Sequence, residues 1–288
     1  MRFEWNIESN DNALFVTAQC NNRCIMCCQP PLHQDDIDDL LEKNLKAIDN
    51  APQGIKVVGI TGGEPTLLGD KLFILIEKIR SKLPETAIQL LSNGRRFSDS
   101  QYAKRMKEVG GDNLFVGIPL HSDYVGDHNL VAGVNGAYDE TMLGLYNLNA
   151  AGVEIELRVV INSINAYRLP LMSEFIYKNL PFVSWVAYMG MEHTGYAIAN
   201  EKQIWIEPEE YKDSLGEAVK RLADWGMDVA IFNIPLCLLR EDARRFSKHS
   251  ISDWKVRYAD CCNACSLKCE CCGLFGTSKK EFNGIKAL

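Results

Sequence analysis

The residues best suited to bind a metal lie in two segments of the chain. All eleven cysteines fall within residues 20–28 or 237–272. In the first segment, Cys20, Cys24 and Cys27 form a C-x3-C-x2-C arrangement directly after an apolar run. Three thiolates suit an iron–sulfur cubane in which one iron stays open to another ligand, whereas structural zinc takes four closed ligands. Spacing alone leaves zinc open as the alternative, with the next cysteine as fourth ligand.

A glycine-rich turn follows the second apolar run. The residues Thr61-Gly-Gly-Glu-Pro-Thr-Leu67 stand where we expect a strand to end. Glycine permits a positive φ and the close approach of a ligand to the backbone, so Gly62 and Gly63 predict a ligand contact. A plain turn, in which Pro65 opens the following helix, is the alternative.

The second cysteine segment offers more thiols than one metal site needs. Cys237 ends the stretch Asn-Ile-Pro-Leu-Cys, and six further cysteines follow within residues 261–272. A closed zinc site and a closed 4Fe–4S cluster each take four protein ligands. The spacing does not separate a zinc ribbon from an iron–sulfur cluster.

Composition excludes several classes of protein. The N-terminal stretch MRFEWNIESNDN has neither the basic start nor the apolar core of a signal peptide, which predicts a cytoplasmic chain with reduced thiols. No run of eighteen apolar residues is present, so we expect no membrane span. The net charge of -7 argues against a broad nucleic-acid-binding surface.

Strand-like and helix-like patterns alternate along the chain. Apolar runs predict strands at 13–20, 55–61, 87–93, 114–120, 154–161 and 182–189, and helical spacing predicts helices at 37–48, 72–79, 102–109, 138–148 and 169–176. Strands separated by helices predict parallel pairing. Six such units occupy about 190 residues, fewer than the eight of a closed (β/α)8 barrel. We therefore expect an α/β chain with a partial (β/α)6 TIM-type barrel over residues 1–200.

The rest of the chain, residues 201–288, predicts a C-terminal domain. It contains one more helical pattern at 209–225, a strand-like stretch at 228–234 and the cysteine-rich tail. The stretch 240–257, with six basic and three acidic residues, is a candidate docking surface, and a solvated face is the alternative.

The three-cysteine motif and the Gly-Gly-Glu-Pro turn together resemble the radical S-adenosylmethionine (radical SAM) superfamily. The resemblance implies a 4Fe–4S cluster whose open iron is chelated by the amino and carboxylate groups of S-adenosylmethionine (SAM). Its implied ligands are Cys20, Cys24 and Cys27. Reduction of the bound sulfonium then releases methionine and a 5′-deoxyadenosyl radical, chemistry that belongs to the cofactor.

The same resemblance implies which residues contact SAM. Met26 stands where members commonly carry an aromatic residue, and its thioether can pack against the adenine ring. For Ser92 and Asn93 an ordinary turn is the alternative, and for Arg158 a structural ion pair. The implied SAM-binding residues are Met26, Gly62, Gly63, Glu64, Pro65, Ser92, Asn93 and Arg158.

Three polar residues near predicted strand ends are candidates for chemistry on the substrate. His121 follows the fourth predicted strand, and His128 and Glu192 fall near the same edge. Histidine and carboxylate side chains bind substrate or transfer protons, so we predict His121 and Glu192 as catalytic. A structural role is the alternative for each.

The cysteine-rich tail is similar to the peptide-modifying branch of the superfamily, whose members often end in a SPASM- or twitch-like auxiliary-cluster domain. That pattern implies a second 4Fe–4S cluster on Cys237, Cys262, Cys265 and Cys271, with Gly273 as the trailing glycine. The motifs CxMCxQPP, NIPLC and the terminal CxGxF further resemble the maturase family of the His-Xaa-Ser peptide system known as its C protein.

This resemblance implies a radical SAM peptide maturase. The implied partners are a peptide or small-protein substrate bearing His-Xaa-Ser repeats, a second radical SAM protein, and a reductant such as flavodoxin or ferredoxin. Two alternatives stay open: a radical SAM enzyme of cofactor or nucleotide biosynthesis that acts on a small molecule, and a zinc-stabilised binding protein without chemistry.

Overall fold

The structure, a computed structural model, describes residues 5–9 and 12–288. Its main strands are β1 (Asn12–Phe15), β2 (Val57–Thr61), β3 (Ala87–Leu91), β4 (Leu114–Pro119), β5 (Glu154–Val160), β6 (Trp185–Met189) and β7 (Val229–Phe232). They form one sheet in chain order. The pairs β1–β2, β2–β3, β3–β4 and β6–β7 are all parallel. The prediction of an α/β chain with parallel strands is confirmed.

Helices separate the strands. They are α1 (Ile37–Asp49), α2 (Asp70–Lys82), α3 (Ser100–Gly110), α4 (Val125–Ala132), α5 (Ala137–Ala150), α6 (Leu169–Asn179), α7 (Tyr196–Ala199), α8 (Glu201–Ile204) and α9 (Pro208–Asp224). The sequence did not predict α4, α7 and α8. They have eight, four and four residues, too few for a clear helical period.

Strand β7 differs from the prediction, which assigns this stretch to the C-terminal domain. It pairs with β6 from Val186↔Val229 to Met189↔Phe232, so α9 and β7 form one more helix–strand unit of the sheet. The strand itself was predicted, as the strand-like stretch at 228–234, but its pairing with β6 makes it the seventh strand of a sheet for which six were predicted. The predicted boundary at residue 200 is not tested by this pairing and stays a prediction.

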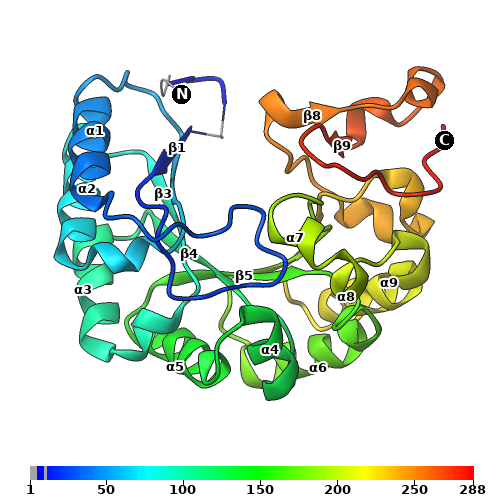
Figure 1. Cartoon of the computed structure of the whole chain (residues 1–288), viewed down its shortest axis with the longest axis horizontal. Helices are drawn as coiled ribbons and strands as arrows, with labels where there is room; N and C mark the ends of the chain where they lie inside the picture. The colour runs from blue at the N-terminus through cyan, green and yellow to red at the C-terminus, as the bar shows by residue number, and fades with distance from the viewer. Residues whose placement is uncertain (1–4, 10–11) are drawn as a thin grey trace. The chain divides into compact units, whose positions relative to one another are not determined.

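The chain divides into two compact units, each described by itself. The first contains β1 to β4 with α1, α2, α3 and α5, and Figure 1 shows α1, α2 and α3 along the strands. Its core is built from side chains on the strands and on α2, all of them fully buried: Val58, Ile60, Ile88, Leu90, Val116, Leu72, Leu75 and Ile76. Burial of these apolar side chains holds the strands in place in the sheet. The residues of the candidate site follow the ends of these strands.

The second unit contains residues 24–28, 120–135 and 157–288. Helices α6 and α9 pack together, and Ser173 Oγ on α6 lies 2.7 Å from the hydroxyl of Tyr188 on β6. Near the C-terminus, β8 (Val256–Arg257) and β9 (Leu274–Phe275) form a short antiparallel pair (Figure 1). The expected cysteine-rich C-terminal region surrounds this pair. None of the described helices has the length and apolar character needed to cross a bilayer.

Candidate functional site

The glycine turn after β2 holds the backbone that leads to Cys20. The amide of Gly63 donates to Thr17 O at 2.7 Å, and that of Glu64 donates to Gln19 O at 2.7 Å. A Cβ on Gly63 would lie 2.0 Å from Gln19 O, so no larger residue fits. The sequence predicted a close approach of a ligand here. In the structure, the chain's own segment 17–19 makes the close approach.

The Glu64 carboxylate ties the end of β2 to the end of β3. It is 1% exposed, and its Oε1 accepts hydrogen bonds from Thr66 N at 3.0 Å, Thr66 Oγ1 at 2.7 Å and Ser92 Oγ at 2.8 Å. Its Oε2 accepts from Asn93 N at 2.7 Å. Burial raises the pKa of Glu64, and these hydrogen bonds oppose that shift. Because four donors of the chain occupy the carboxylate, its side chain positions the neighbouring turn.

Two side chains of that turn hold the loop containing Cys20. Asn93 Nδ2 donates to Asn21 Oδ1 at 2.6 Å, and Arg95 Nη1 donates to Asn21 O and Asn22 Oδ1, both at 2.8 Å. Burial raises the pKa of the Cys20 thiol, and the hydrogen bond from Asn22 N at 3.4 Å opposes this. Arg95 was not predicted from the sequence, although its position directly after Ser-Asn-Gly was a signal.

Helix α5 supports the same turn from the other side. Arg95 Nε lies 2.5 Å from Glu140 Oε2, and Thr141 Oγ1 donates to Asn93 O at 3.1 Å. A Cβ on Gly144 would lie 2.3 Å from Gly94 O, so glycine is required for this close packing. The turn after β3 is thus fixed by β2 and by α5 before any ligand binds.

In the second unit, the segment of Cys24 and Cys27 is anchored through its backbone. Ile25 N donates to Val131 O at 3.0 Å, and Tyr196 N donates to Cys27 O at 2.8 Å. A Cβ on Gly195 would lie 2.4 Å from Cys27 O, so this approach also requires glycine. These contacts fix the cysteine segment between the end of α4 and the start of α7.

Met26 packs in an apolar cluster that includes Met191 and Ile204. Its Sδ lies 3.9 Å from Asn162 Nδ2. Arg158, on β5, directs its Nε to Met189 Sδ at 3.4 Å. The predicted contacts of Met26 and Arg158 with SAM stay predictions.

His121 lies beside Cys24. Its Nε2 is 4.0 Å from Cys24 Sγ, and its ring centroid is 4.9 Å from that of His128. His121 N donates to His128 Nδ1 at 3.3 Å, and Asn165 Nδ2 donates to His121 O at 2.9 Å. Burial lowers the pKa of His121 well below its usual range and that of His128 to about 4. Both rings are therefore neutral at pH 7.

Glu192, the other predicted catalytic residue, lies in an ion pair. Its Oε2 is 3.2 Å from Lys255 Nζ, and its Oε1 accepts a hydrogen bond from Thr277 Oγ1. The carboxylate thus links the loop after β6 to the C-terminal region. This ion pair gives Glu192 a structural role, which was the alternative to catalysis. The catalytic role of Glu192 stays a prediction.

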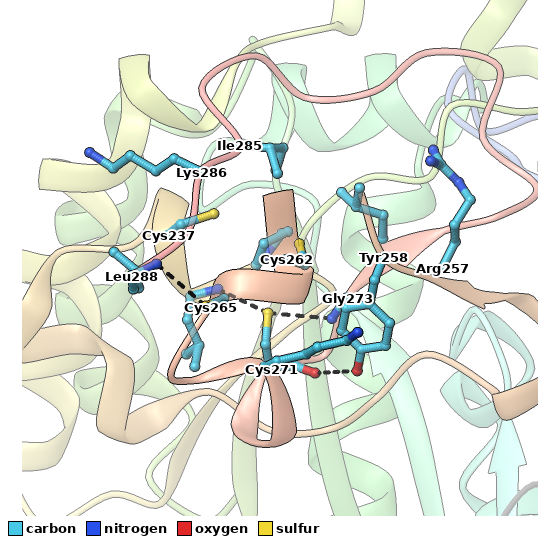
Figure 2. A pocket seen from close by; sticks show the side chains of 14 residues that line it. Cys237, Arg257, Tyr258, Cys262, Cys265, Cys271, Gly273, Ile285, Lys286 and Leu288 are labelled. Carbon is cyan, nitrogen blue, oxygen red and sulfur yellow. Dashed lines mark hydrogen bonds between the residues drawn. The ribbon is translucent and has the colours of Figure 1, made fainter. Parts of the chain in front are cut away.

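Four thiols of the C-terminal region line one pocket (Figure 2). They are Cys237, Cys262, Cys265 and Cys271, together with Gly273. They come from separate short 3-10 helices and the residues that follow them, so tertiary folding brings them together. The remaining tail cysteines, Cys261, Cys269 and Cys272, do not line this pocket. The set that does is the predicted auxiliary ligand set.

The surroundings of Cys271 favour its thiolate form, whereas burial raises the pKa of the Cys237 and Cys262 thiols. Cys271 Sγ accepts hydrogen bonds from Leu236 N at 3.4 Å and Gly273 N at 3.5 Å, and Cys265 Sγ accepts from Leu288 N at 3.4 Å. A hydrogen bond from the Cys272 thiol and these amides lower the pKa of Cys271 to about 6. Four thiols that line one pocket, with backbone amides donating to Cys265 and Cys271, fit an iron–sulfur cluster. As they stand, no three His, Cys, Asp or Glu side chains of the described residues form a group that could hold a metal ion.

Comparison with known proteins relates the chain to one superfamily. Residues 14–166 match the family described as "Radical SAM superfamily". The chain is 26% identical over 233 residues to the Fe-coproporphyrin III synthase of Methanosarcina barkeri, covering 76% of this chain and 54% of that protein. It is 31% identical over 187 residues to the GTP 3′,8-cyclase of Helicobacter pylori, covering 62% and 55%. The chain thus spans about half the length of these relatives.

Solved structures show the same fold. Streptococcus suis SuiB bound to S-adenosylmethionine is similar with a TM-score of 0.59 at 15% identity, covering 76% of this chain and 49% of that one. Native anSMEcpe with bound AdoMet is similar with a TM-score of 0.59 at 20% identity, covering 76% and 62%. At these identities the likeness concerns the fold alone.

Proposed function

Because the chain belongs to the radical SAM superfamily, we propose that it is an enzyme that cleaves SAM reductively and modifies a peptide or small protein. Its family implies a 4Fe–4S cluster and SAM as cofactors, and Cys20, Cys24 and Cys27 are the assigned ligands. When bound, the cluster supplies the electron that cleaves SAM. The chain's own contribution is positioning: Glu64 and Arg95 fix the loop of Cys20, and the neutral His121 ring lies beside Cys24.

The observation that carries the peptide assignment is the C-terminal thiol pocket. The sequence pattern of the peptide-modifying branch assigns Cys237, Cys262, Cys265 and Cys271, and the same four thiols line the pocket, with three other tail cysteines left out. A second 4Fe–4S cluster on these thiols would accept an electron or bind the substrate. SuiB has been solved with its precursor peptide SuiA and anSMEcpe with the peptide Cp18Cys, which supports a peptide substrate for a chain of this fold.

The partners of this function follow from its chemistry. Reductive cleavage of SAM needs a low-potential donor such as flavodoxin or ferredoxin, and free thiols with iron–sulfur clusters suit a reducing cytoplasm. A His-Xaa-Ser repeat protein is the proposed substrate, and a second radical SAM protein is the proposed partner in the modification.

Product analysis tests this function. The anaerobically reconstituted chain should contain about eight irons, for two 4Fe–4S clusters. With reductant and SAM it should release 5′-deoxyadenosine and change the mass of a His-Xaa-Ser repeat peptide. About four irons, with zinc in the tail, would contradict the auxiliary cluster. Turnover that changes only a small molecule would contradict the peptide substrate.

Small-molecule chemistry is the second candidate. It is favoured by the curated relatives, which are named as enzymes that make Fe-coproporphyrin III or cyclise GTP. GTP and porphyrin substrates therefore belong in the same assay, followed by mass spectrometry. Product from one of these, with the peptide unchanged, would favour this candidate.

A further inference from the structure

A basic hollow lies in the same C-terminal region as the thiol pocket. Its volume is about 380 Å³, within the range of ligand clefts, which is roughly 300–1,000 Å³. The polar side chains that line it are Arg244, Arg245, Ser247, His249 and Glu270. Of the stretch 240–257, which the sequence offered as a candidate docking surface, only Arg244, Arg245, Ser247 and His249 line this hollow.

The two arginines of this hollow differ in ion pairing from the other basic residues of the same segment. Arg240 pairs with Asp242, Lys255 with Glu192 and Arg257 with Glu281. Within the described part of the chain, by contrast, no carboxylate lies within 4.0 Å of a side-chain nitrogen of Arg244 or Arg245. These two guanidinium groups are therefore available to an anion, on a chain whose net charge is -7.

The existing contacts of the two arginines leave donors for a ligand. Arg244 Nε donates to Leu236 O at 3.1 Å, which fixes the side chain while its terminal nitrogens make no hydrogen bond to the described residues. The Arg245 guanidinium lies 4.7 Å from the Phe246 ring. Ser247 Oγ is buried in the same hollow and has no hydrogen-bond partner among the described residues. The two planar guanidinium forks suit planar carboxylates.

We propose that this hollow binds acidic side chains of the peptide substrate. This inference rests on the proposed peptide modification and names a feature of the substrate, a glutamate- or aspartate-rich stretch. The hollow is lined by two arginines and one acidic residue, Glu270, so its side-chain charge stays basic.

The test uses the full, anaerobically reconstituted chain and a fluorescent hexaglutamate peptide at low ionic strength. Fluorescence anisotropy should show binding that R244Q/R245Q weakens about tenfold, the effect of two partly exposed ion pairs. The matched control, K104Q/R105Q on α3, removes the same charge from an exposed site and should change binding by less than about twofold. Iron content and circular dichroism establish that each variant is folded, and R245Q alone gives a milder third variant, since Arg245 lines the hollow.

Three outcomes would overturn the inference: no binding of hexaglutamate, equal loss in both double variants, or stronger displacement by inorganic phosphate than by glutamate at equal ionic strength. The last outcome would make the hollow a phosphate site. Turnover separates this inference from the proposed function. If the repeat peptide is modified and R244Q/R245Q leaves its KM unchanged, the hollow assignment alone is wrong. If hexaglutamate binds but no peptide is ever modified, the proposed function is wrong and the carboxylate site stands.

Discussion

The turn network around Cys20 and the C-terminal thiol pocket are held together by different means. Around Cys20, the ends of two parallel strands are joined by the buried Glu64 carboxylate, and Arg95 extends this network to the cysteine loop. Around the pocket, β8 and β9 have two residues each, and the thiols stand on short 3-10 helices. The first arrangement is therefore fixed by the sheet, whereas we expect the second to depend on the metal that we propose for the thiols.

The largest expected effect is that of Cys24→Ala. It removes a ligand of the proposed SAM cluster, so 5′-deoxyadenosine formation should fall to background. The surrounding fold should persist, because backbone contacts of Ile25 and Cys27 anchor the segment. Cys28→Ala is the matched control, since it removes the adjacent thiol that has no assigned role. Liquid chromatography measures the product, and circular dichroism measures the fold. Equal loss in both variants would show that the segment, not the ligand, was damaged.

The C-terminal pocket should respond differently. In Cys271→Ala, iron should fall from about eight to about four per chain, and residues 261–288 should become more sensitive to protease, because the metal stabilises this region. Cys269→Ala, which removes a thiol outside the pocket, should leave both properties unchanged. Iron analysis and mass spectrometry of the fragments provide the measurements. A protease-resistant tail in Cys271→Ala that has lost the iron of its C-terminal pocket would contradict the difference between the two regions.

The sequence predicted which residues belong to the two regions better than it predicted the hydrogen bonds between those residues. Apolar runs placed Gly63 and Ser92 close to the ends of β2 and β3, but the first predicted strand, at 13–20, runs past the end of β1 at Phe15. The role of Glu64 as an acceptor for the turn after β3 did not follow, because it depends on the pairing of β2 with β3. Arg95 was missed for the same reason.

In the tail, the spacing of the cysteines alone could not select the metal ligands. Seven thiols with similar spacing permit many sets of four, and only the resemblance to a family pattern selected one. The structure separates them by position: Cys272 is 1% exposed and packs with Ile251 and Phe275, whereas Cys271 faces the pocket. Neighbouring residues in an extended stretch point in opposite directions, a difference that spacing does not reveal until the backbone conformation is known.

Glu64→Gln tests how strongly the sheet fixes the Cys20 loop. The amide places N–H donors where four donors of the chain now converge, so at least one is left without an acceptor. The free energy of unfolding should fall by about 2–3 kcal/mol. Glu140→Gln changes a half-exposed partner of Arg95 and should cost less than about 1 kcal/mol. Anaerobic urea denaturation distinguishes them, and equal losses would show that Glu64 has no special role.

The smallest expected effect concerns the pH dependence of stability. It tests whether the stability of the second unit depends on its buried, neutral histidines. Burial lowers the pKa of His128 from 6.5 to about 4, so the unfolded chain binds a proton more readily than the folded chain. Stability from this group is present above about pH 6.5 and is lost as the pH falls toward 4. His128→Asn retains an acceptor for His121 N and removes the titration. Its loss of stability between pH 7.5 and 5.5 should be smaller than that of the parent chain by about 1 kcal/mol.

The control for this prediction is His33→Asn, which removes an exposed histidine and should leave the pH dependence of the parent chain unchanged. Urea denaturation at the two pH values measures the difference. The remaining acid sensitivity of His128→Asn should come from His121, which burial also keeps neutral. An unchanged pH dependence in His128→Asn would mean that His128 takes up its proton without cost in the folded chain. Protonation of the ring next to His121 would then leave the segment of Cys24 intact, and that segment would be fixed by its backbone contacts rather than by the charge state of the histidines.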